Sequence, residues 1–393
     1  MSVFSQRVQD IQSSPTLKLV QLKNQLRAQG KSILDFGAGE PDFSTPTSIK
    51  EAGIAAIRAD QTRYTTTSGT AALKKAIRQA VATDLGREVA DNEIVVSPGS
   101  KYGLFLLMQA VVDPGTEVIV PRPYWVSYPE MVRFCGGVPV FADHLRSERL
   151  FEQTAESYIA CWTPKTRAVI INSPNNPTGI VMNREELTKT IRFFADRGVW
   201  VVVDDCYRQI LYTEESYPSP WLAAPEKNDR VVVVSSLSKT YAMTGWRVGY
   251  TVGPVALIAA MTKIQEHSTS NPCSISQAAA VEALSGNQES VRQMVAEYRR
   301  RRDFFAGRID QIGGIPYRLP DGAFYFFADF SAPIARKGLA DDNALALDIL
   351  DKLNLILVPG SSFGAPGYLR ISYATSMADL ATGLDRLATY VAG

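Results

Sequence analysis

A lysine among hydroxyl side chains is the first residue of this sequence that could do chemistry. Lys239 lies in the segment 236–249 (SLSKTYAMTGWRVG), which directly follows the apolar run 231–234 (VVVV). The carboxyl end of a buried strand is where α/β sheets bind ligands. A lysine at that place, followed by Arg247, suits a nucleophile that forms a Schiff base beside an anion site. A surface lysine in a polar loop fits the same local pattern.

A carboxylate terminates a second apolar run. Asp204 ends the segment 199–204 (VWVVVD) and is followed by another acid, Asp205. Burying a charge without a partner is costly, so an acid at the end of a buried strand needs a cation nearby. The ring nitrogen of a cationic cofactor would provide one. A helix N-cap or a structural salt bridge is an equally good interpretation of the pattern alone.

The segment 97–101 (SPGSK) has the composition of an anion site. It lies between a predicted strand and a predicted helix, so backbone N–H groups, Ser100 and Lys101 would meet at a helix N-terminus. Such a loop can hold a phosphate. The segment is not a Walker A motif, and no GxGxxG follows a strand, so nothing indicates a dinucleotide.

Two further polar residues accompany apolar runs. Asn176 follows the run 168–172 (AVIIN) and lies in the segment 175–179 (NNPTG), which also has the composition of a simple turn. Arg370 lies within the apolar segment 368–373 (YLRISY). Its planar guanidinium matches a carboxylate, although a strand-edge arginine that extends to water fits as well.

The elements that would position these residues are short apolar runs that alternate with helices. Several runs are wholly apolar and rich in Val and Ile, which is typical of strands covered by helices on both faces. Helices are predicted at 101–112 and 184–197, and strands at 93–97, 117–120, 138–141, 168–172, 199–204, 231–235 and 248–252. The pattern predicts an α/β fold in which a seven-stranded, mostly parallel sheet lies between helices.

The last third of the chain has a different texture. A long charged helix is predicted at 289–312, because core-like residues recur along it at helical spacing. Strands are predicted at 315–319, 324–328, 355–358 and 368–373, with helices near 341–353 and at the C-terminus. We therefore expect an N-terminal arm and helix (1–35) that packs with the smaller domain, a large domain (36–288) and a small α+β domain (289–393).

Composition argues against several classes of function. The 393 residues include 41 Lys and Arg and 40 Asp and Glu, a formal charge of +1, so neither nucleic acid nor a membrane is expected as a partner. Two histidines, and four cysteines without a CxxC spacing, argue against a metal site. No apolar stretch is long enough to span a membrane, and the N-terminus lacks the apolar core of a signal peptide, so a cytoplasmic location is expected.

Taken in order, these segments resemble the class I aminotransferases, the pyridoxal 5'-phosphate (PLP) enzymes of the aspartate aminotransferase fold. The resemblance extends from 37–43 (GAGEPDF) to 370–376 (RISYATS), and the lysine segment fits the class signature at each constrained position. The segment 123–129 (PYWVSYP) is similar to the bacterial aspartate and aspartate/prephenate aminotransferase branch. The resemblance implies fold type I of the PLP enzymes, a large PLP-binding domain and a homodimer with shared active sites.

The resemblance also implies roles for individual residues. Lys239 would hold the cofactor as an internal aldimine, Asp204 would pair with its pyridinium nitrogen, and Tyr207 would hydrogen-bond its ring oxygen; these are the expected catalytic residues. The other expected cofactor ligands are Gly99, Ser100, Lys101, Trp125, Asn176, Ser236 and Arg247, with Tyr64 reaching the phosphate held by the other subunit. The expected substrate-binding residues are Gly39, Lys101, Trp125, Asn176 and Arg370, which grips the α-carboxylate.

The implied reaction moves an α-amino group from an L-amino acid, with aspartate expected, to 2-oxoglutarate in a ping-pong cycle. No segment matches the second arginine that animal and enteric enzymes use for the side-chain carboxylate, whereas Lys101 stands where the bacterial branch has a lysine in that role. That branch also tends to carry a lysine near the position of Gln12. Specificity for an aromatic amino acid, prephenate or another donor, and a PLP-dependent β-lyase, are the alternatives.

Overall fold

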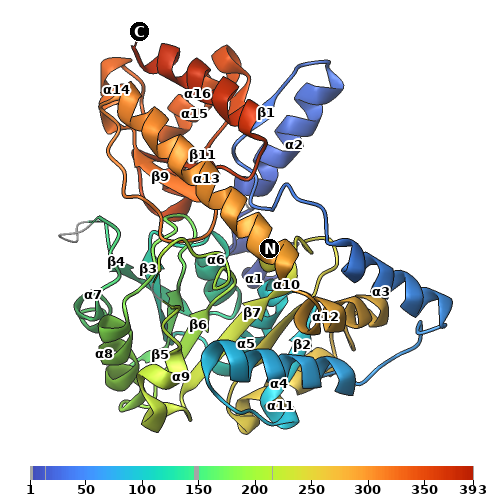
Figure 1. Ribbon diagram of the computed structural model, residues 1–393. Helices are drawn as coiled ribbons and strands as arrows, with labels where there is room; N and C mark the ends of the chain where they lie inside the picture. Colours follow the sequence, from blue (N-terminus) through green and yellow to red (C-terminus); the bar gives the residue numbers. More distant parts are fainter. Residues whose placement is uncertain (1–2, 14, 146–149, 215, 393) are drawn as a thin grey trace.

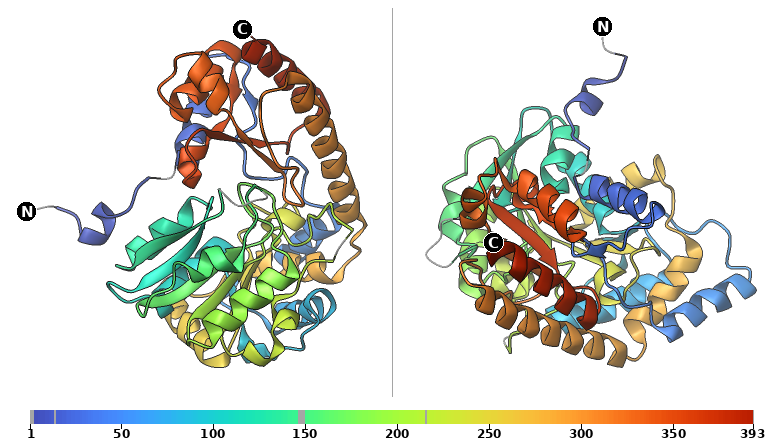
Figure 2. Two further views of the ribbon diagram at one scale, coloured as in Figure 1. Left: turned by 90° about the vertical axis from the view of Figure 1, so that its left-hand side faces the viewer. Right: turned by 90° about the horizontal axis from the view of Figure 1, so that it is seen from above.

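The computed structural model describes residues 3–13, 15–145, 150–214 and 216–392, without the side chains of residues 15–20 and 27. A larger part with a central sheet and a smaller part formed mainly by the C-terminal third are visible in Figure 1. The N-terminal residues project outward from these two parts (Figure 2). None of the helices among the described residues is long and apolar enough to cross a membrane.

The larger part is built around a seven-stranded sheet with the strand order β2-β8-β7-β6-β5-β3-β4. β8 runs antiparallel to both of its neighbours, and the other pairs are parallel. The strands are β2 (Ile94–Ser97), β3 (Glu117–Arg122), β4 (Val138–Asp143), β5 (Thr166–Asn172), β6 (Trp200–Asp204), β7 (Val231–Ser236) and β8 (Gly249–Val252). Each predicted apolar run is a strand, so the predicted α/β fold is confirmed.

Helices cover both faces of this sheet. They are α3 (Thr47–Arg58), α4 (Ala71–Leu85), α5 (Ser100–Val111), α6 (Ser127–Phe134), α7 (Ala155–Ile159), α8 (Arg184–Ala195), α9 (Pro220–Ala223), α10 (Leu237–Thr240), α11 (Val255–Glu266) and α12 (Ser274–Ser285). Val201 and Val203 of β6 pack in one core with α4, α8 and α12, whereas Val202 packs in another with α5, α6 and α11. Because successive strand residues point to opposite faces, a sheet covered on both sides needs an unbroken apolar run.

The smaller part begins with the long helix α13 (Glu289–Ile312), as predicted. Its three-stranded antiparallel sheet has the order β11-β12-β9. The elements are β9 (Tyr325–Asp329), α14 (Ser331–Arg336), α15 (Asp342–Leu353), β10 (Leu355–Ile356), β11 (Val358–Pro359), β12 (Tyr368–Ser372) and α16 (Met377–Ala392). The chain also contributes Tyr207, Ile210 and Tyr212, which follow β6, to the hydrophobic core of this part.

Two of the strands predicted in this region are wrong. Residues 315–319 form no strand, and Tyr317 makes only a single bridge to Ala328. Pro316 and Pro320 flank this bridge and have no N–H group to extend a ladder. The predicted strand 355–358 is two short strands with different partners, because β10 pairs with β1 and β11 pairs with β12.

The N-terminal segment contacts both parts. It contains α1 (Gln6–Gln9), α2 (Pro15–Ala28) and β1 (Leu34–Asp35). β1 runs parallel to β10, and Leu22 and Leu26 of α2 pack near Ile356. The backbone N–H of Gln12 instead donates to Glu130 of α6, 2.8 Å away. The segment therefore joins the smaller part through β1 and α2 and reaches the larger part through Gln12.

Candidate active site

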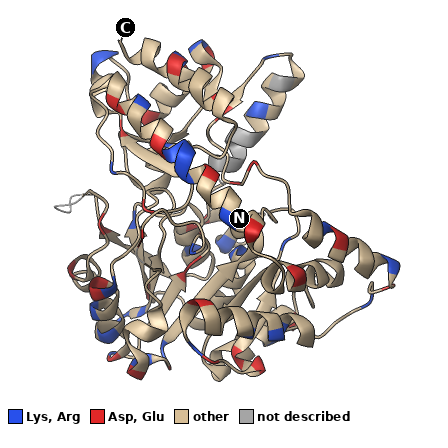
Figure 3. Cartoon of the chain, in the orientation of Figure 1, with Lys and Arg blue, Asp and Glu red and all other residues tan. Residues whose placement is uncertain are grey.

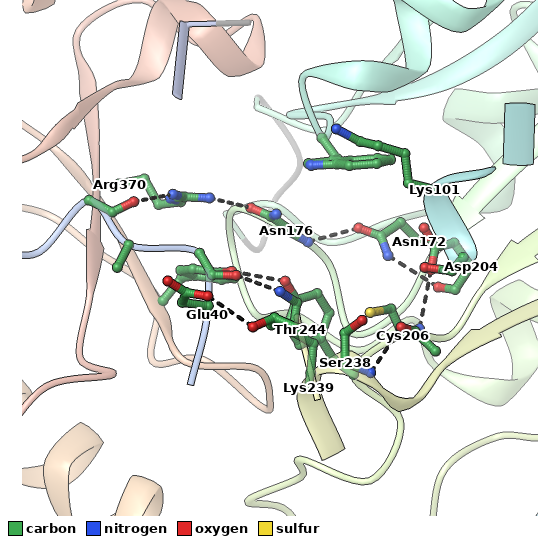
Figure 4. Close-up of a pocket in the computed structure, with 18 of the residues that line it drawn as sticks. Glu40, Lys101, Asn172, Asn176, Asp204, Cys206, Ser238, Lys239, Thr244 and Arg370 are labelled. Atoms are coloured by element: carbon green, nitrogen blue, oxygen red, sulfur yellow. Dashed lines mark hydrogen bonds between the residues drawn. The ribbon is translucent and has the colours of Figure 1, made fainter. Parts of the chain in front are cut away.

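A cavity of about 380 Å³ lies at the carboxyl ends of the parallel strands β5, β6 and β7, where the two parts of the molecule meet. Figure 4 shows the side chains that point into it. Among the residues predicted from the sequence, those that line the cavity are Gly39, Ser100, Lys101, Trp125, Asn176, Asp204, Tyr207, Ser236, Lys239, Arg247 and Arg370. The structure thus gathers these residues from seven separate segments of the chain at the place where α/β sheets bind ligands.

Lys239 reaches the cavity from the single helical turn α10, which directly follows β7. The turn begins at Ser236, whose Oγ accepts a hydrogen bond from the N–H of Ser238 at 3.1 Å. Lys239 Nζ donates to the carbonyl oxygen of Gly39 at 2.5 Å. Burial lowers the pKa of Lys239, because desolvation disfavours the ammonium form. A lowered pKa increases the fraction of neutral amine, which is the form that attacks a carbonyl carbon.

Asp204, the last residue of β6, is a buried carboxylate at the floor of the cavity. It accepts hydrogen bonds from the hydroxyl of Tyr128 at 2.6 Å and from the backbone N–H of Cys206 at 3.2 Å. Within the described part of the chain, no lysine or arginine pairs with it. Desolvation raises the pKa of Asp204 to about 6, even though both hydrogen bonds favour the ionised form. The cavity therefore presents a carboxylate that a bound cation would complete.

A chain of hydrogen bonds runs from Asp204 to Arg370 across the cavity wall (Figure 4). The amide group of Asn172 donates to the carbonyl oxygen of Asp204 at 3.1 Å, and its oxygen accepts from the N–H of Asn176 at 2.8 Å. Asn176 in turn accepts from Arg370 Nη1 at 3.0 Å, while Arg370 Nη2 donates to the carbonyl oxygen of Gly37 at 2.8 Å. Arg370 is 2% exposed, so these contacts hold a buried guanidinium that faces the cavity.

The loop before α5 and the side chain of Arg247 form the predicted anion site. Arg247 Nη2 donates to the carbonyl oxygen of Pro98 at 3.3 Å. Gly99 does not line the cavity, but a Cβ atom on it would lie 2.5 Å from Arg247 Nη2, and its φ of +84° also favours glycine. The close approach places the guanidinium beside the first turn of α5, where N–H groups without helical partners can bind an anion.

Lys101 and Trp125 lie together in the cavity wall. Lys101 Nζ is 4.9 Å from the centroid of the Trp125 ring. Desolvation lowers the pKa of Lys101, and the nearby charge of Arg247 adds to the effect. An ammonium group that is poorly hydrated and close to a second cation is a favourable site for an anionic ligand.

The two predicted tyrosines have opposite surroundings. Tyr207 is buried, and its hydroxyl lies 2.8 Å from that of Tyr325, which comes from β9. Desolvation raises the pKa of Tyr207 well above that of an ordinary phenol, so it stays protonated and can donate a hydrogen bond. Tyr64 is 91% exposed and does not line the cavity of its own chain.

The sequence interpretation missed several residues of the cavity wall. They are Lys23, Asp35, Glu40, Tyr128, Asn172, Cys206, Ser238, Thr244 and Tyr325. Tyr128 could have been found, because it lies one helical turn after Trp125 in the segment that carried the family resemblance. Tyr325 carries no such signal, since the segment 324–327 (FYFF) has the composition of a buried strand.

The donor set of the cavity fits PLP. A carboxylate without a cationic partner matches a protonated ring nitrogen, and an amine of lowered pKa matches an aldehyde. The cradle formed by Gly99, α5 and Arg247 matches a phosphate, because a side chain at residue 99 would fill it. The buried guanidinium of Arg370 matches the carboxylate of an amino acid.

The chain is similar to known proteins over almost its full length. Residues 31–387 match the family model described as aminotransferase class I and II. An aspartate/prephenate aminotransferase of Nitrosomonas europaea is 43% identical over 98% of this chain and 99% of that protein, and an aspartate aminotransferase of Geobacillus stearothermophilus is 40% identical over 98% of each. The structure of aspartate aminotransferase from Thermus thermophilus with maleate has a TM-score of 0.92 and 39% identity, covering 99% of this chain and 100% of that one. The chain therefore belongs to the class I and II aminotransferases, PLP-dependent enzymes that act on small amino and oxo acids.

Proposed function

We propose that this aminotransferase uses aspartate as amino donor and 2-oxoglutarate as acceptor. The observation that carries the proposal is that the cavity holds two cations besides those proposed to bind the cofactor or paired with Asp35: Arg370 from β12 and Lys101 from α5 (Figure 4). Aspartate and 2-oxoglutarate each have two carboxylates, whereas an apolar amino acid has only one. A second cation in the cavity wall would favour the dicarboxylates, because each carboxylate would then have a charged partner.

The relatives support a dicarboxylate substrate. Two of them are named aspartate aminotransferase or aspartate/prephenate aminotransferase, and the Thermus thermophilus structure contains maleate, a four-carbon dicarboxylate. At about 40% identity over the full chain, the same reaction is the best-supported assignment for this protein.

The roles proposed for the residues follow from their chemistry. PLP, when bound, supplies the electron sink that makes the substrate Cα–H bond acidic. Asp204 would keep a negative charge against the ring nitrogen, and Tyr207 would donate to the ring oxygen. Lys239 Nζ would take the proton from the substrate Cα as general base and would then be the protonated group that can act as general acid. Arg370 orients the α-carboxylate so that Cα lies within reach of Lys239.

The remaining proposed ligands hold the cofactor while the amine of Lys239 is free. Ser100, Ser236, Arg247 and the N–H groups beside Gly99 would bind the phosphate. The indole of Trp125 would stack on the ring. This anchoring is needed because the second half of a ping-pong cycle starts from a cofactor that is not covalently attached.

An amino-donor panel tests the proposal. The holoenzyme is supplied with 2-oxoglutarate and each of the twenty amino acids, and the oxo-acid product is measured. We expect aspartate to give the highest kcat/KM. In a Lys101→Ala variant, kcat/KM for aspartate should fall by about tenfold, as expected for loss of one hydrogen bond between charged groups, whereas an apolar donor should lose little.

The control for this experiment is Lys165→Ala, since Lys165 is an exposed lysine outside the cavity. It should leave kcat/KM for both donors unchanged. Equal losses for aspartate and the apolar donor in the Lys101 variant would mean that Lys101 serves the phosphate or the fold. Absence of turnover with every amino acid would contradict the assignment of donor and acceptor.

Prephenate is a second candidate acceptor, because the Nitrosomonas europaea relative is named for both substrates. Gln12 occupies the place where the resembling branch has a lysine, and its backbone is held by Glu130. Lys23 is a cation that lines the cavity, but it is paired with Asp35 at 2.7 Å. Both features predict weaker binding of prephenate than of 2-oxoglutarate, which the ratio of kcat/KM values with the two acceptors measures.

The proposal includes a homodimer with shared active sites. Tyr64 is highly exposed and does not line the cavity of its own chain, which supports a role at the phosphate of a second subunit. Mixing a Tyr64→Phe chain with a Lys239→Ala chain tests this role, because hybrid dimers would contain one site with both residues intact. The domain boundaries after residues 35 and 288 and a cytoplasmic location remain predictions.

A further inference from the structure

Tyr325 is a buried cavity residue to which neither the sequence nor the family resemblance gave a role. It lies on β9, and its hydroxyl is 2.8 Å from the hydroxyl of Tyr207. The guanidinium carbon of Arg370 lies 4.4 Å from the centroid of its ring. One side chain therefore contacts both the residue proposed to bind the cofactor oxygen and the residue proposed to bind the substrate carboxylate.

The strand register explains the second contact. In the antiparallel pair of β9 and β12, Tyr325 lies opposite Ser372, and Arg370 lies opposite Phe327. Tyr325 and Arg370 are thus diagonal neighbours on the same face of the sheet, a spacing that long side chains can bridge. The first contact joins the two parts of the molecule, because Tyr207 follows β6 of the larger sheet.

We propose that Tyr325 is a positioning residue that fixes both Tyr207 and Arg370. The group that binds the cofactor oxygen and the group that binds the substrate carboxylate are then both held in place by contacts with this one side chain. The inference rests on the functions proposed above for Tyr207 and Arg370. It assigns to Tyr325 two separable contributions, one made by its hydroxyl and one made by its ring.

The hydroxyl contribution follows from counting protons. A phenol has a single proton to donate. When Tyr207 donates its proton to the cofactor oxygen, the hydrogen bond between the two tyrosines must run from Tyr325 to Tyr207. Hydrogen bonds in a chain polarise one another, so a donor behind Tyr207 strengthens its donation to the cofactor. It also holds the Tyr207 hydroxyl in one rotamer.

The ring contribution follows from the packing of Arg370. Its guanidinium lies 4.4 Å from the Tyr325 ring and 5.0 Å from the Phe363 ring. A cation over aromatic faces is stabilised, most strongly where water is excluded. The rings leave the edges of the guanidinium free to bond Asn176, Gly37 and a carboxylate, so they fix its plane without competing for its N–H groups.

Four holoenzyme variants separate these contributions: Tyr325→Phe, Tyr325→Leu, Phe363→Leu and Tyr207→Phe. Two quantities are measured for each, the pH midpoint of the absorbance change of bound cofactor and the Kd of maleate. The midpoint reports how well the anionic ring oxygen is stabilised, and maleate reports carboxylate binding. Circular dichroism and thermal unfolding check that each variant is folded.

We expect Tyr325→Phe to raise the midpoint by roughly half a pH unit, because Tyr207 becomes a weaker donor. Its ring remains, so the Kd of maleate should be unchanged. Tyr325→Leu should raise the midpoint equally and also raise the Kd about fivefold, the loss expected for one cation–π contact. Phe363→Leu is the matched control, since its ring contacts Arg370 but not Tyr207, and it should raise the Kd alone.

A double variant provides the decisive comparison. If Tyr325 acts through Tyr207, the variant that carries both Tyr207→Phe and Tyr325→Phe should have the same pH midpoint of the cofactor absorbance as Tyr207→Phe alone. If Tyr207→Phe raises the midpoint but Tyr325→Phe does not, the inference about Tyr325 is overturned, and the proposed function is unaffected. A midpoint that Tyr207→Phe itself does not move would overturn the role of Tyr207, and the inference with it.

Discussion

Replacing Asp204 with asparagine should stabilise the cofactor-free protein and weaken the cofactor complex. Burial raises the pKa of Asp204 from the ordinary 3.8 to about 6. The folded state therefore resists ionisation, and this group makes stability fall as pH rises from 3.8 through about 6. This difference in pKa corresponds to a destabilisation of the folded state by ~3 kcal/mol. The destabilisation is complete above about pH 6 and absent below about pH 4.

The substitution also removes one acceptor. The amide oxygen of Asp204→Asn can still accept from Tyr128, whose hydroxyl is 2.6 Å from the native carboxylate. The hydrogen bond from the N–H of Cys206 is lost, at a cost of about 1 kcal/mol. We therefore expect a net stabilisation of ~2 kcal/mol at pH 8 and a small destabilisation near pH 4.

Urea denaturation of the cofactor-free protein at pH 4, 6 and 8 measures this difference, at one protein concentration throughout. The neighbouring acid is the control, because Asp205 is also buried but is paired with Arg208 at 3.0 Å. Burial raises the pKa of Asp205 as well, so Asp205→Asn relieves part of the same ionisation penalty but also loses the ion pair with Arg208, and we expect it to stabilise the protein less at pH 8 than Asp204→Asn does. An Asp204→Asn variant that is less stable than wild type at pH 8 would refute the reasoning.

Two further predictions concern the cofactor. Lys239→Ala should bind PLP without a covalent bond and lose turnover by about 1000-fold or more, because it lacks the general base. Mass spectrometry after borohydride reduction should find a cofactor adduct in the wild type and none in the variant. An adduct in the variant would mean that another lysine binds the cofactor. Gly99→Ala should lower the affinity for PLP by about tenfold or more, since its Cβ would lie 2.5 Å from Arg247 Nη2 and its φ of +84° disfavours a side chain. Gly115→Ala is the matched control in a titration by absorbance, because Gly115 has a similar φ of +81° but nothing within 4 Å of its Cβ position; equal losses of affinity would exclude the contact with Arg247 as the cause.

Two of the residues that sequence reasoning found lie where apolar runs end. Asp204 is the last residue of one strand buried on both faces and Lys239 lies just after another, and such strands are recognisable because both sets of alternating residues are apolar. Their chain positions also place them at one edge of the sheet, because neighbouring parallel strands end together. The larger sheet and the centre of the cavity were therefore predictable.

The residues that were missed depend on contacts between distant segments. Asn172 has the position of a strand end, but its role in joining Asp204 to Asn176 requires the register of β5 and β6. Tyr325 lies in an aromatic strand that indicates only a core. The strand predicted at 315–319 failed for a related reason, because apolar composition around Tyr317 does not reveal whether a partner strand can pair beyond one bridge.

The burial of Tyr207, Ile210 and Tyr212 in the C-terminal core has a consequence for how the molecule melts. These residues belong to a segment that emerges from the central sheet, so detaching the C-terminal portion would expose apolar surface on both sides. Neither portion then has a complete hydrophobic core of its own. In a partly unfolded form, the entropy gained by the chain would not offset the cost of exposing this apolar surface to water. Calorimetry of the cofactor-free chain should accordingly give one heat-absorption peak, with equal calorimetric and van't Hoff enthalpies.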